Sequence, residues 1–250
     1  MLNVNDKIEL TVKWLQDKVD ESKTNGLIVG LSGGIDSAVC AALMKKAFPN
    51  NSLGVILPCG SNNVDKEYAL KLIENIKIDS IEIDLTDEHN SIYNNVIGKI
   101  ENMNIVNENL SNANLKARLR MSTIYAVANS LNYLVVGTDN AAELLTGYFT
   151  KYGDGGVDIL PIAKITKGEV CKWAEVLNIP KEIIKRPPTA GLWEGQTDED
   201  EMGTTYNMID KYIIGEKIPK NDEKIILNLF NRSKHKRELP AQPSEFREEK

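Results

Sequence analysis

The sequence predicts an α/β fold: a single domain in which a parallel sheet is flanked by helices on both faces. Short apolar runs alternate along the chain with stretches of helical periodicity, and this order is typical of parallel sheets. A Gly/Ser-rich turn joins the first apolar run to the helix that follows it. The chain has 250 residues, 42% of them hydrophobic, which is enough for one large domain with a substantial core.

The chain opens with an amphipathic helix, because four apolar residues recur there at helical spacing. They are Ile8, Val12, Leu15 and Val19. Strands and helices then alternate. We expect strands at 27–31, 53–57, 78–85 and 133–137, and helices at 36–47, 64–76, 87–99 and 115–130. In such sheets ligands bind beyond the carboxyl ends of the strands, and Gly30, Pro58 and Gly137 all fall at those ends.

The remainder of the chain is less regular. A glycine-rich loop is expected at 152–156, and a helix at 167–177 with Thr166 as its N-cap. Residues 186–200 contain two prolines and two glycines and are predicted to form a long loop. Two further helices are expected at 202–213 and 222–229, and a basic run at 232–237 lies near the C-terminus.

The net charge, the cysteines and the apolar runs of the chain argue against several classes of protein. The net charge of −6 argues against a nucleic-acid-coating surface but leaves room for a local cationic site that binds an anionic small molecule. Three cysteines without metal or redox spacing fit a reducing compartment. No apolar run approaches membrane-spanning length and the start does not resemble a signal peptide, so we expect a soluble, cytoplasmic protein without membrane or nucleic-acid partners.

The turn after the first strand is typical of a phosphate-binding loop. It comprises Gly30, Leu31, Ser32, Gly33, Gly34, Ile35, Asp36 and Ser37. Glycines let the backbone approach a ligand closely, and the N–H groups of the first helical turn face an anion. The loop lacks the lysine of the Walker form, and it carries Asp36, whose carboxylate repels a phosphate unless a metal ion lies between them. The loop therefore predicts a nucleotide with Mg²⁺; the alternative is a turn that only packs.

Two further side chains complete this expected centre. Glu143, which follows the strand at 133–137, is the best second carboxylate for Mg²⁺, whereas Asp139 could simply cap the helix that begins there. Lys167 lies at the start of a helix, where a cation opposes the helix dipole unless an anion compensates it. That position favours contact between Lys167 and a phosphate.

Several longer segments resemble one family. The loop Ser32-Gly33-Gly34-Ile35-Asp36-Ser37 is similar to that of the N-type ATP pyrophosphatases, and other segments resemble the ammonia-dependent NAD synthetases among them. These segments are residues 114–121, 136–143, 146–158, 188–192 and 233–237. They cover nearly the whole chain in order, and the segment Thr146–Asp158 is the most particular. The resemblance implies a Rossmann-like adenine nucleotide alpha hydrolase fold, with residues 1–250 as one domain and no glutaminase domain.

The resemblance also implies the roles of individual residues. Residues 30–37 would hold the ATP phosphates, and Thr138, Lys167 and Thr189 would also contact ATP. Asp36 and Glu143 would bind Mg²⁺, with Asp36 and Lys167 closest to the chemistry. Deamido-NAD would contact Arg118, Lys151, Asp158, His235 and Lys236. From the residues alone, Asp158 could instead bond to backbone N–H groups, and His235-Lys236 could be a solvated basic tail.

The sequence departs from the family at three positions. Asn140 stands where His is frequent, Gly191 replaces a common acidic residue, and Asn62 replaces a frequent Gln. These departures affect loop contacts more than the expected chemistry. Two alternatives remain: another adenylating enzyme with the same loop, such as a GMP synthetase core or a tRNA-modifying enzyme, and a non-catalytic nucleotide-binding module of the universal-stress type.

The family makes NAD from deamido-NAD, ATP and ammonia through an acyl-adenylate, with AMP and pyrophosphate as the other products. The resemblance therefore implies a C–N ligase of NAD biosynthesis that acts as a homodimer. The chain has two histidines, and this reaction requires no Ser-His-Asp or Cys-His nucleophile. Because the intermediate must avoid water, we expect residues 186–200 and 60–64 to close over bound substrates.

Overall fold

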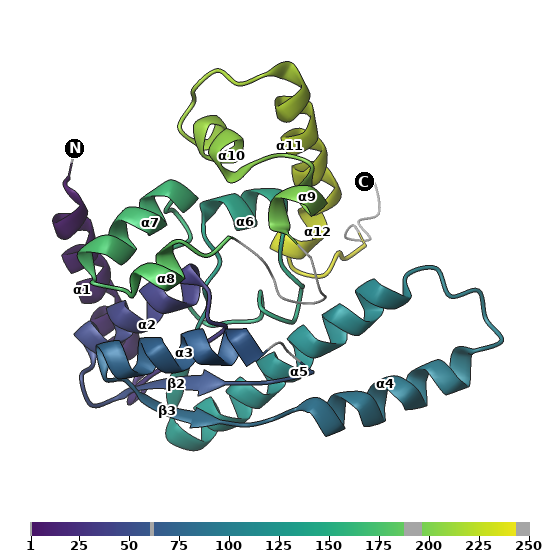
Figure 1. Cartoon of the computed structure of the whole chain (residues 1–250), viewed down its shortest axis with the longest axis horizontal. Helices are drawn as coiled ribbons and strands as arrows, with labels where there is room; N and C mark the ends of the chain where they lie inside the picture. The colour runs from purple at the N-terminus through teal and green to yellow at the C-terminus, as the bar shows by residue number, and fades with distance from the viewer. Residues whose placement is uncertain (1, 61–62, 188–196, 244–250) are drawn as a thin grey trace, which may run out of the picture.

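A parallel sheet of four strands lies between layers of helices, as predicted (Figure 1). The computed structural model describes residues 2–60, 63–187 and 197–243. The strands are β1 (Gly26–Gly30), β2 (Ser52–Ile56), β3 (Asp79–Glu82) and β4 (Tyr133–Val136), in the order β3-β2-β1-β4. Every pairing is parallel, and Leu27 of β1 lies between Ser52 and Leu134. The carboxyl ends of all four strands therefore lie along one edge.

One face of the sheet packs against α1 (Val4–Ser22), α2 (Ile35–Ala47) and α7 (Lys167–Val176). Leu27 and Val29 of β1 join the apolar cluster there, in which Trp173 of α7 is fully buried. The predicted apolar stripe of α1 is confirmed, since its four residues are the buried residues of that helix. Short α8 (Lys181–Ile184) follows α7 on this side (Figure 1).

The opposite face packs against α5 (Glu108–Leu131). Ile28 of β1, Val55 of β2 and Val135 of β4 form this second cluster with Ile124 and Ala128 of α5. The alternation of Leu27, Ile28 and Val29 between two clusters is the period-two pattern of a strand buried on both sides. α4 (Thr86–Ile100) and the first half of α5 project beyond the sheet as an antiparallel helix pair (Figure 1).

A third apolar cluster lies beyond the carboxyl end of β4. It is formed by α6 (Ala141–Thr146), α10 (Tyr206–Ile213) and α11 (Lys220–Arg232), with Ile209 and Ile226 fully buried. In Figure 1 these helices stand on the side of the molecule opposite β3. The remaining helices are α3 (Asn63–Ile76), α9 (Asp198–Met202) and α12 (Lys234–Arg237).

Two predictions of secondary structure are corrected. The single helix expected at 202–213 is wrong. α9 ends at Met202, because its C-cap Gly203 has a left-handed φ of 73°, and α10 begins after Thr205, which caps it by accepting from the Met208 N–H. The strand expected at 78–85 is shorter, because β3 is an edge strand that pairs with β2 over Asp79–Glu82. Within the described residues, no helix combines the length and apolar character needed to cross a membrane.

Candidate active site

A cavity of about 800 Å³ opens at the carboxyl edge of the sheet. Gly30 at the end of β1, Pro58 after β2 and Gly137 after β4 all line it. These are the three strand ends at which the sequence predicts a ligand site. A cavity of this size is large enough for a nucleotide.

The predicted phosphate loop forms one wall of the cavity. All of its residues from Gly30 to Ser37 line the cavity except Gly33. Gly33 has a φ of +76°, and a Cβ atom there would lie 2.4 Å from the Asp65 carbonyl oxygen, so only glycine fits. Gly34 is the N-cap of α2 and provides no side-chain capping bond to the first turn. The N–H groups of that turn are therefore available to an anion.

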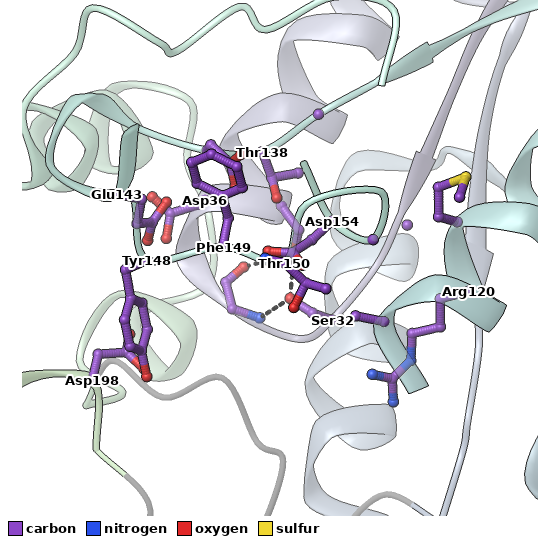
Figure 2. Close-up of a pocket in the computed structure, with 18 of the residues that line it drawn as sticks. Ser32, Asp36, Arg120, Thr138, Glu143, Tyr148, Phe149, Thr150, Asp154 and Asp198 are labelled. Carbon is purple, nitrogen blue, oxygen red and sulfur yellow. Dashed lines mark hydrogen bonds between the residues drawn. The ribbon is translucent and has the colours of Figure 1, made fainter. Parts of the chain in front are cut away.

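Asp36, Glu143 and Lys167 meet at one end of the cavity. Lys167 Nζ donates to Asp36 Oδ2 at 2.5 Å and lies 3.6 Å from Glu143 Oε1. All three side chains are largely buried and line the cavity. Figure 2 shows Asp36 and Glu143 side by side, with Arg120 at the opposite end of the cavity. The structure thus brings together the two expected metal ligands and the expected phosphate-binding lysine.

Burial and neighbouring charges shift the pKa values of Glu143 and Lys167. Burial and the neighbouring Asp36 raise the pKa of Glu143 to about 7, although Lys167 and the Asn140 N–H oppose the shift. Burial alone would lower the pKa of Lys167, but Asp36 and Glu143 outweigh it and raise that pKa above its ordinary value. The lysine is therefore held as a cation by two carboxylates, and its expected contact with a phosphate stays a prediction.

Asn140 organises this centre, and sequence reasoning did not identify it as a site residue. Its Nδ2 donates to Asp36 Oδ1 at 2.9 Å, while its Oδ1 accepts from the N–H groups of Ala142 and Glu143. Glu143 Oε2 in turn accepts from the Asn140 N–H at 3.0 Å, which completes a capping box. The suggestion that Asp139 caps α6 is wrong, since Asn140 is the N-cap.

Two residues from the C-terminal third also reach this centre. The Tyr206 hydroxyl lies 3.2 Å from Glu143 Oε1 and 3.0 Å from Asp198 Oδ2, and Lys167 Nζ lies 4.7 Å from the Tyr206 ring centroid. Burial and the charge of Glu143 raise the pKa of Tyr206, so it stays a neutral donor. Tyr206 and Asp198 come from α10 and α9, whose positions sequence periodicity does not place.

The first turn of α7 is fixed from outside the helix. Thr166 caps it, as predicted, by accepting from the Glu169 N–H at 3.3 Å. Asp210 of α10 accepts from the Lys167 N–H at 3.0 Å and from the Gly168 N–H at 2.7 Å. A carboxylate at the positive end of the helix dipole stabilises that end. The backbone that carries Lys167 is therefore held by two neighbouring segments.

The five residues expected to contact deamido-NAD fall in three places. His235 and Lys236 line the cavity, and Lys236 Nζ donates to the carbonyls of Gly147 and Phe149 at 2.7 and 2.6 Å. Lys151 lines a smaller neighbouring hollow with His235, and its Nζ donates to the carbonyls of His235 and Glu238. The pair belongs to the short helix α12, in which Lys236 is half-buried and anchored by these two bonds, whereas His235 is exposed, as in the alternative of a solvated basic segment.

Arg118 and Asp158 lie outside the cavity lining in the described part of the chain. The exposed guanidinium of Arg118 donates to the Lys151 carbonyl at 3.4 Å. Asp158 accepts from the Tyr125 hydroxyl at 2.9 Å and from the Val135 N–H at 2.8 Å, which matches the packing alternative for this residue. The role of both residues in binding stays a prediction.

Other predicted contacts have mixed outcomes. Thr138 lines the cavity at the end of β4. Thr189, Asn62 and Gly191 lie outside the described residues, and so do parts of the segments 186–200 and 60–64 that we expect to close over substrates.

Arg120 lies two residues after Arg118 on α5, on a different face of the helix. It lines the cavity, where its Nε donates to the Leu57 carbonyl at 3.0 Å, whereas Arg118 does not. All three cysteines are free thiols, with Cys40 and Cys59 buried and Cys171 partly buried.

The donor set fits a magnesium ion that is shared with phosphates. No three His, Cys, Asp or Glu side chains gather as a metal site in the described part of the chain. Asp36 and Glu143, which both approach Lys167 Nζ, offer two carboxylates. Mg²⁺ is usually bound by one or two carboxylates and takes its other ligands from phosphate oxygens and water. These two residues are therefore suited to an ion that arrives with a nucleotide.

Known proteins resemble this chain over nearly its whole length. A family model described as NAD synthase matches residues 7–240. The NH(3)-dependent NAD(+) synthetase of Alkaliphilus oremlandii (strain OhILAs) is 56% identical over 244 residues, 96% of this chain and 98% of that protein. Among solved structures, NMN synthetase from Francisella tularensis has a TM-score of 0.90 at 38% identity and covers 98% of this chain and 100% of its own. The NH3-dependent NAD synthetase from Campylobacter jejuni has a TM-score of 0.76 at 29% identity, with the same coverage.

Proposed function

This chain belongs to the NAD synthase family, and from that premise we propose that it catalyses the ATP-dependent amidation of deamido-NAD with ammonia. The products are NAD, AMP and pyrophosphate. One observation carries the proposal: the phosphate loop, the pair Asp36 and Glu143, and Lys167 all face a single cavity. That arrangement suits the chemistry of a nucleotide that is cleaved between its α and β phosphates.

The first step activates the nicotinate carboxylate. A carboxylate is a poor electrophile because its leaving group would be oxide. Attack of a carboxylate oxygen on the α-phosphorus of ATP forms the acyl-adenylate and breaks the bond to pyrophosphate. Ammonia then attacks the acyl carbon, AMP leaves with the electron pair of the C–O bond, and the nitrogen loses a proton to give the amide.

The protein contributes mainly position and charge to these steps. The N–H groups at the start of α2 bind the phosphate oxygens, and the glycine backbone of the loop allows them to approach closely. Lys167 is held as a cation by Asp36 and Glu143 and stabilises the charge that develops on the departing pyrophosphate. The absence of a γ-phosphate lysine in the loop agrees with cleavage at the α-phosphorus.

Mg²⁺ would be held by Asp36 and Glu143, and it supplies charge neutralisation for the pyrophosphate group. Asn140 orients both ligands, through its bond to Asp36 Oδ1 and through the N–H that holds Glu143 Oε2. Tyr206 donates to the second oxygen of Glu143. These contacts leave each carboxylate in a fixed orientation toward the cavity.

The nicotinate half of the substrate is expected near His235 and Lys236, which line the same cavity. The exposed positions of Arg118 and Asp158 suit contact with a substrate that extends beyond the cavity, and the family resemblance implies that a second subunit completes this part of the substrate site. We therefore expect a homodimer, and light scattering that gives the mass of one chain, 27.8 kDa, at assay concentration would contradict it. We also expect a cytoplasmic protein, which suits its free cysteines.

A second candidate substrate is nicotinate mononucleotide. The observation that favours it is the TM-score of 0.90 to the NMN synthetase from Francisella tularensis, against 0.76 for the NAD synthetase from Campylobacter jejuni. The chemistry at the carboxylate would be the same, and only the adenylate half of the substrate would be missing. The higher identity to a named NAD synthetase, 56%, favours deamido-NAD.

The test is a direct competition. The protein is incubated with ATP, Mg²⁺ and ammonium together with deamido-NAD, nicotinate mononucleotide, or both, and NAD and NMN are separated and quantified. We expect NAD as the main product, with one AMP and one pyrophosphate per NAD formed. NMN as the main product would replace the first candidate by the second, and hydrolysis of ATP without either product would contradict both. Glu143→Gln serves as the inactive control, because it removes the negative charge of one expected metal ligand.

A further inference from the structure

We propose that Arg186 is a positioning residue for the phosphate loop, and that it fixes the loop in the conformation that binds the β and γ phosphates of ATP. The inference rests on the proposed function, since it assigns a role within the same nucleotide site. Arg186 follows α8 and is distant in sequence from the loop, so no motif points to it.

The guanidinium of Arg186 joins three segments. Its Nη1 donates to the Gly33 carbonyl at 3.3 Å, and its Nη2 forms an ion pair with Asp65 in the first turn of α3. Its Cζ lies 5.1 Å from the centroid of the Tyr68 ring on the same helix. Arg186 and Asp65 also line the cavity beside Gly34. The residue therefore bridges the loop and the helix that form this wall.

The contact with Gly33 fixes a whole peptide group. The peptide between Gly33 and Gly34 is planar and trans, so its carbonyl and its N–H point in opposite directions. Arg186 holds the carbonyl, and the Gly34 N–H donates to Ser32 Oγ at 3.3 Å. The carbonyl and the N–H of this peptide group are thus both hydrogen-bonded, and these two bonds fix the orientation of the backbone at the start of α2.

The restraint by Arg186 matters because the two glycines of this peptide would otherwise allow the backbone many conformations. Gly33 is left-handed and Gly34 follows it, and two consecutive glycines lose more conformational entropy on ordering than any other pair. A loop that is already ordered binds phosphates without that entropic cost. Arg186 keeps the loop ordered because its planar guanidinium contacts Gly33 and Asp65 at the same time. The single ammonium group of a lysine cannot make both contacts in this geometry.

The environment makes the contact rigid. The side chains of Arg186 and Asp65 are 17% and 20% exposed. An ion pair at this depth is screened weakly, and the aromatic ring of Tyr68 covers one face of the guanidinium. Because Arg186 is paired with Asp65 and donates to the Gly33 carbonyl, the part we assign to it is to orient the loop.

The experiment compares ATP with AMP, which lacks the β and γ phosphates. Binding of each to the full-length protein is measured by isothermal titration calorimetry, with Mg²⁺ present, for the wild type, Arg186→Gln and Arg186→Lys. We expect both variants to lose about ten-fold in ATP affinity, the size of one hydrogen bond to a charged group, and less than about two-fold in AMP affinity. In turnover, KM for ATP rises while KM for the nicotinate substrate stays unchanged.

The control is Lys185→Gln, the exposed neighbour, which should bind both nucleotides like the wild type. If Arg186→Gln unfolds, Arg186→Lys decides, because it keeps a cation beside Asp65. Unchanged ATP affinity in a folded variant, or equal losses for ATP and AMP, would overturn the inference. A wild type that binds ATP but makes neither NAD nor NMN would refute the proposed function instead, so the two failures are distinct.

Discussion

Asn140 shows how much of the site depends on a residue without chemistry of its own. One side chain caps α6, holds Asp36 Oδ1 and, through its N–H, holds Glu143. It is fully buried. A short amide is suited to this position, because its oxygen accepts from the helix while its nitrogen donates to the carboxylate.

Two substitutions separate these roles. Asn140→Ala should lower stability by about 1 kcal/mol through the lost cap and lower kcat by about 10- to 100-fold through the misplaced carboxylate. Asn140→Ser keeps an uncharged capping oxygen but loses the amide N–H that donates to Asp36, so it should regain most of the stability and little of the activity. Thermal unfolding and steady-state kinetics of both variants test this. Recovery of activity in Asn140→Ser would contradict the orienting role.

Asp139 gives a pH-dependent prediction. It is 5% exposed, and burial together with the charges of Asp154, Glu143 and Asp36 holds its pKa well above the ordinary value. The folded protein therefore binds this proton more tightly than the unfolded chain, and the charged form destabilises the fold increasingly as pH rises above the unfolded value of about 3.9.

Asp139→Asn should therefore stabilise the protein at pH 8 by about 1–3 kcal/mol, and the gain should shrink toward pH 4. For a chain of this length, Tm should rise by about 2–4 °C per kcal/mol. The exposed Asp79→Asn is the matched control and should show no such trend. A gain in Tm that is the same at both pH values would show that the charge of Asp139 is not its cause.

Residues of this centre differ in how far sequence alone predicts them. Asp36 and Glu143 are predictable, because each follows a strand end and a carboxylate beside a phosphate requires a metal. Asn140 and Tyr206 are not, because their contacts depend on side-chain geometry across elements. Arg120 and Arg118 both fit the same helix pattern, and packing on the sheet decides that Arg120 enters the cavity.

At the scale of elements, α10 positions α7 through Asp210. Its carboxylate accepts from two N–H groups in the first turn of α7, the turn that carries Lys167. Asp210→Asn should cost about 1–2 kcal/mol of stability, since one charge-assisted bond is lost, and should lower kcat because Lys167 is less well placed. Thermal unfolding and kinetics provide the two readouts.

Thr166→Ala is the matched control for this element. It removes the local cap of the same helix, at a cost of about 1 kcal/mol, and leaves the link to α10 intact. We expect it to lower Tm about as much as Asp210→Asn but to retain nearly normal kcat. Equal losses of kcat in the two variants would mean that stability of α7 alone matters, and not its attachment to α10.

Local patterns predict the elements of the sheet and its two helical faces well, and those of the C-terminal third poorly. Strands such as β1 are short, wholly apolar and bounded by turn residues, which leaves little ambiguity. The break between α9 and α10 depends on the left-handed Gly203 and on burial of Tyr206 against α6, which the local pattern does not reveal. The segment at α12 has the composition of a solvated tail, yet it packs because Lys236 satisfies two carbonyls.

At the scale of the whole molecule, the topology places the site. Because β1, β2 and β4 run in the same direction, the segments that follow them converge on one cavity, and the helical layer of α6, α10 and α11 closes it on one side. The predicted fold class is therefore confirmed, and with it the edge at which the site lies. The positions of α9 and α10, which supply Asp198 and Tyr206, arise from tertiary packing, and local sequence patterns do not reveal them.

The most direct test of the acyl-adenylate mechanism traces the carboxylate oxygens of the substrate by isotope labelling. Deamido-NAD labelled with ¹⁸O in both carboxylate oxygens is converted with ATP, Mg²⁺ and ammonium, and the products are analysed by mass spectrometry. Attack of the carboxylate on the α-phosphorus predicts one ¹⁸O atom in each AMP and none in pyrophosphate. Label in pyrophosphate or inorganic phosphate, or its loss to water with unlabelled AMP, would contradict activation of the substrate as an acyl-adenylate in this cavity.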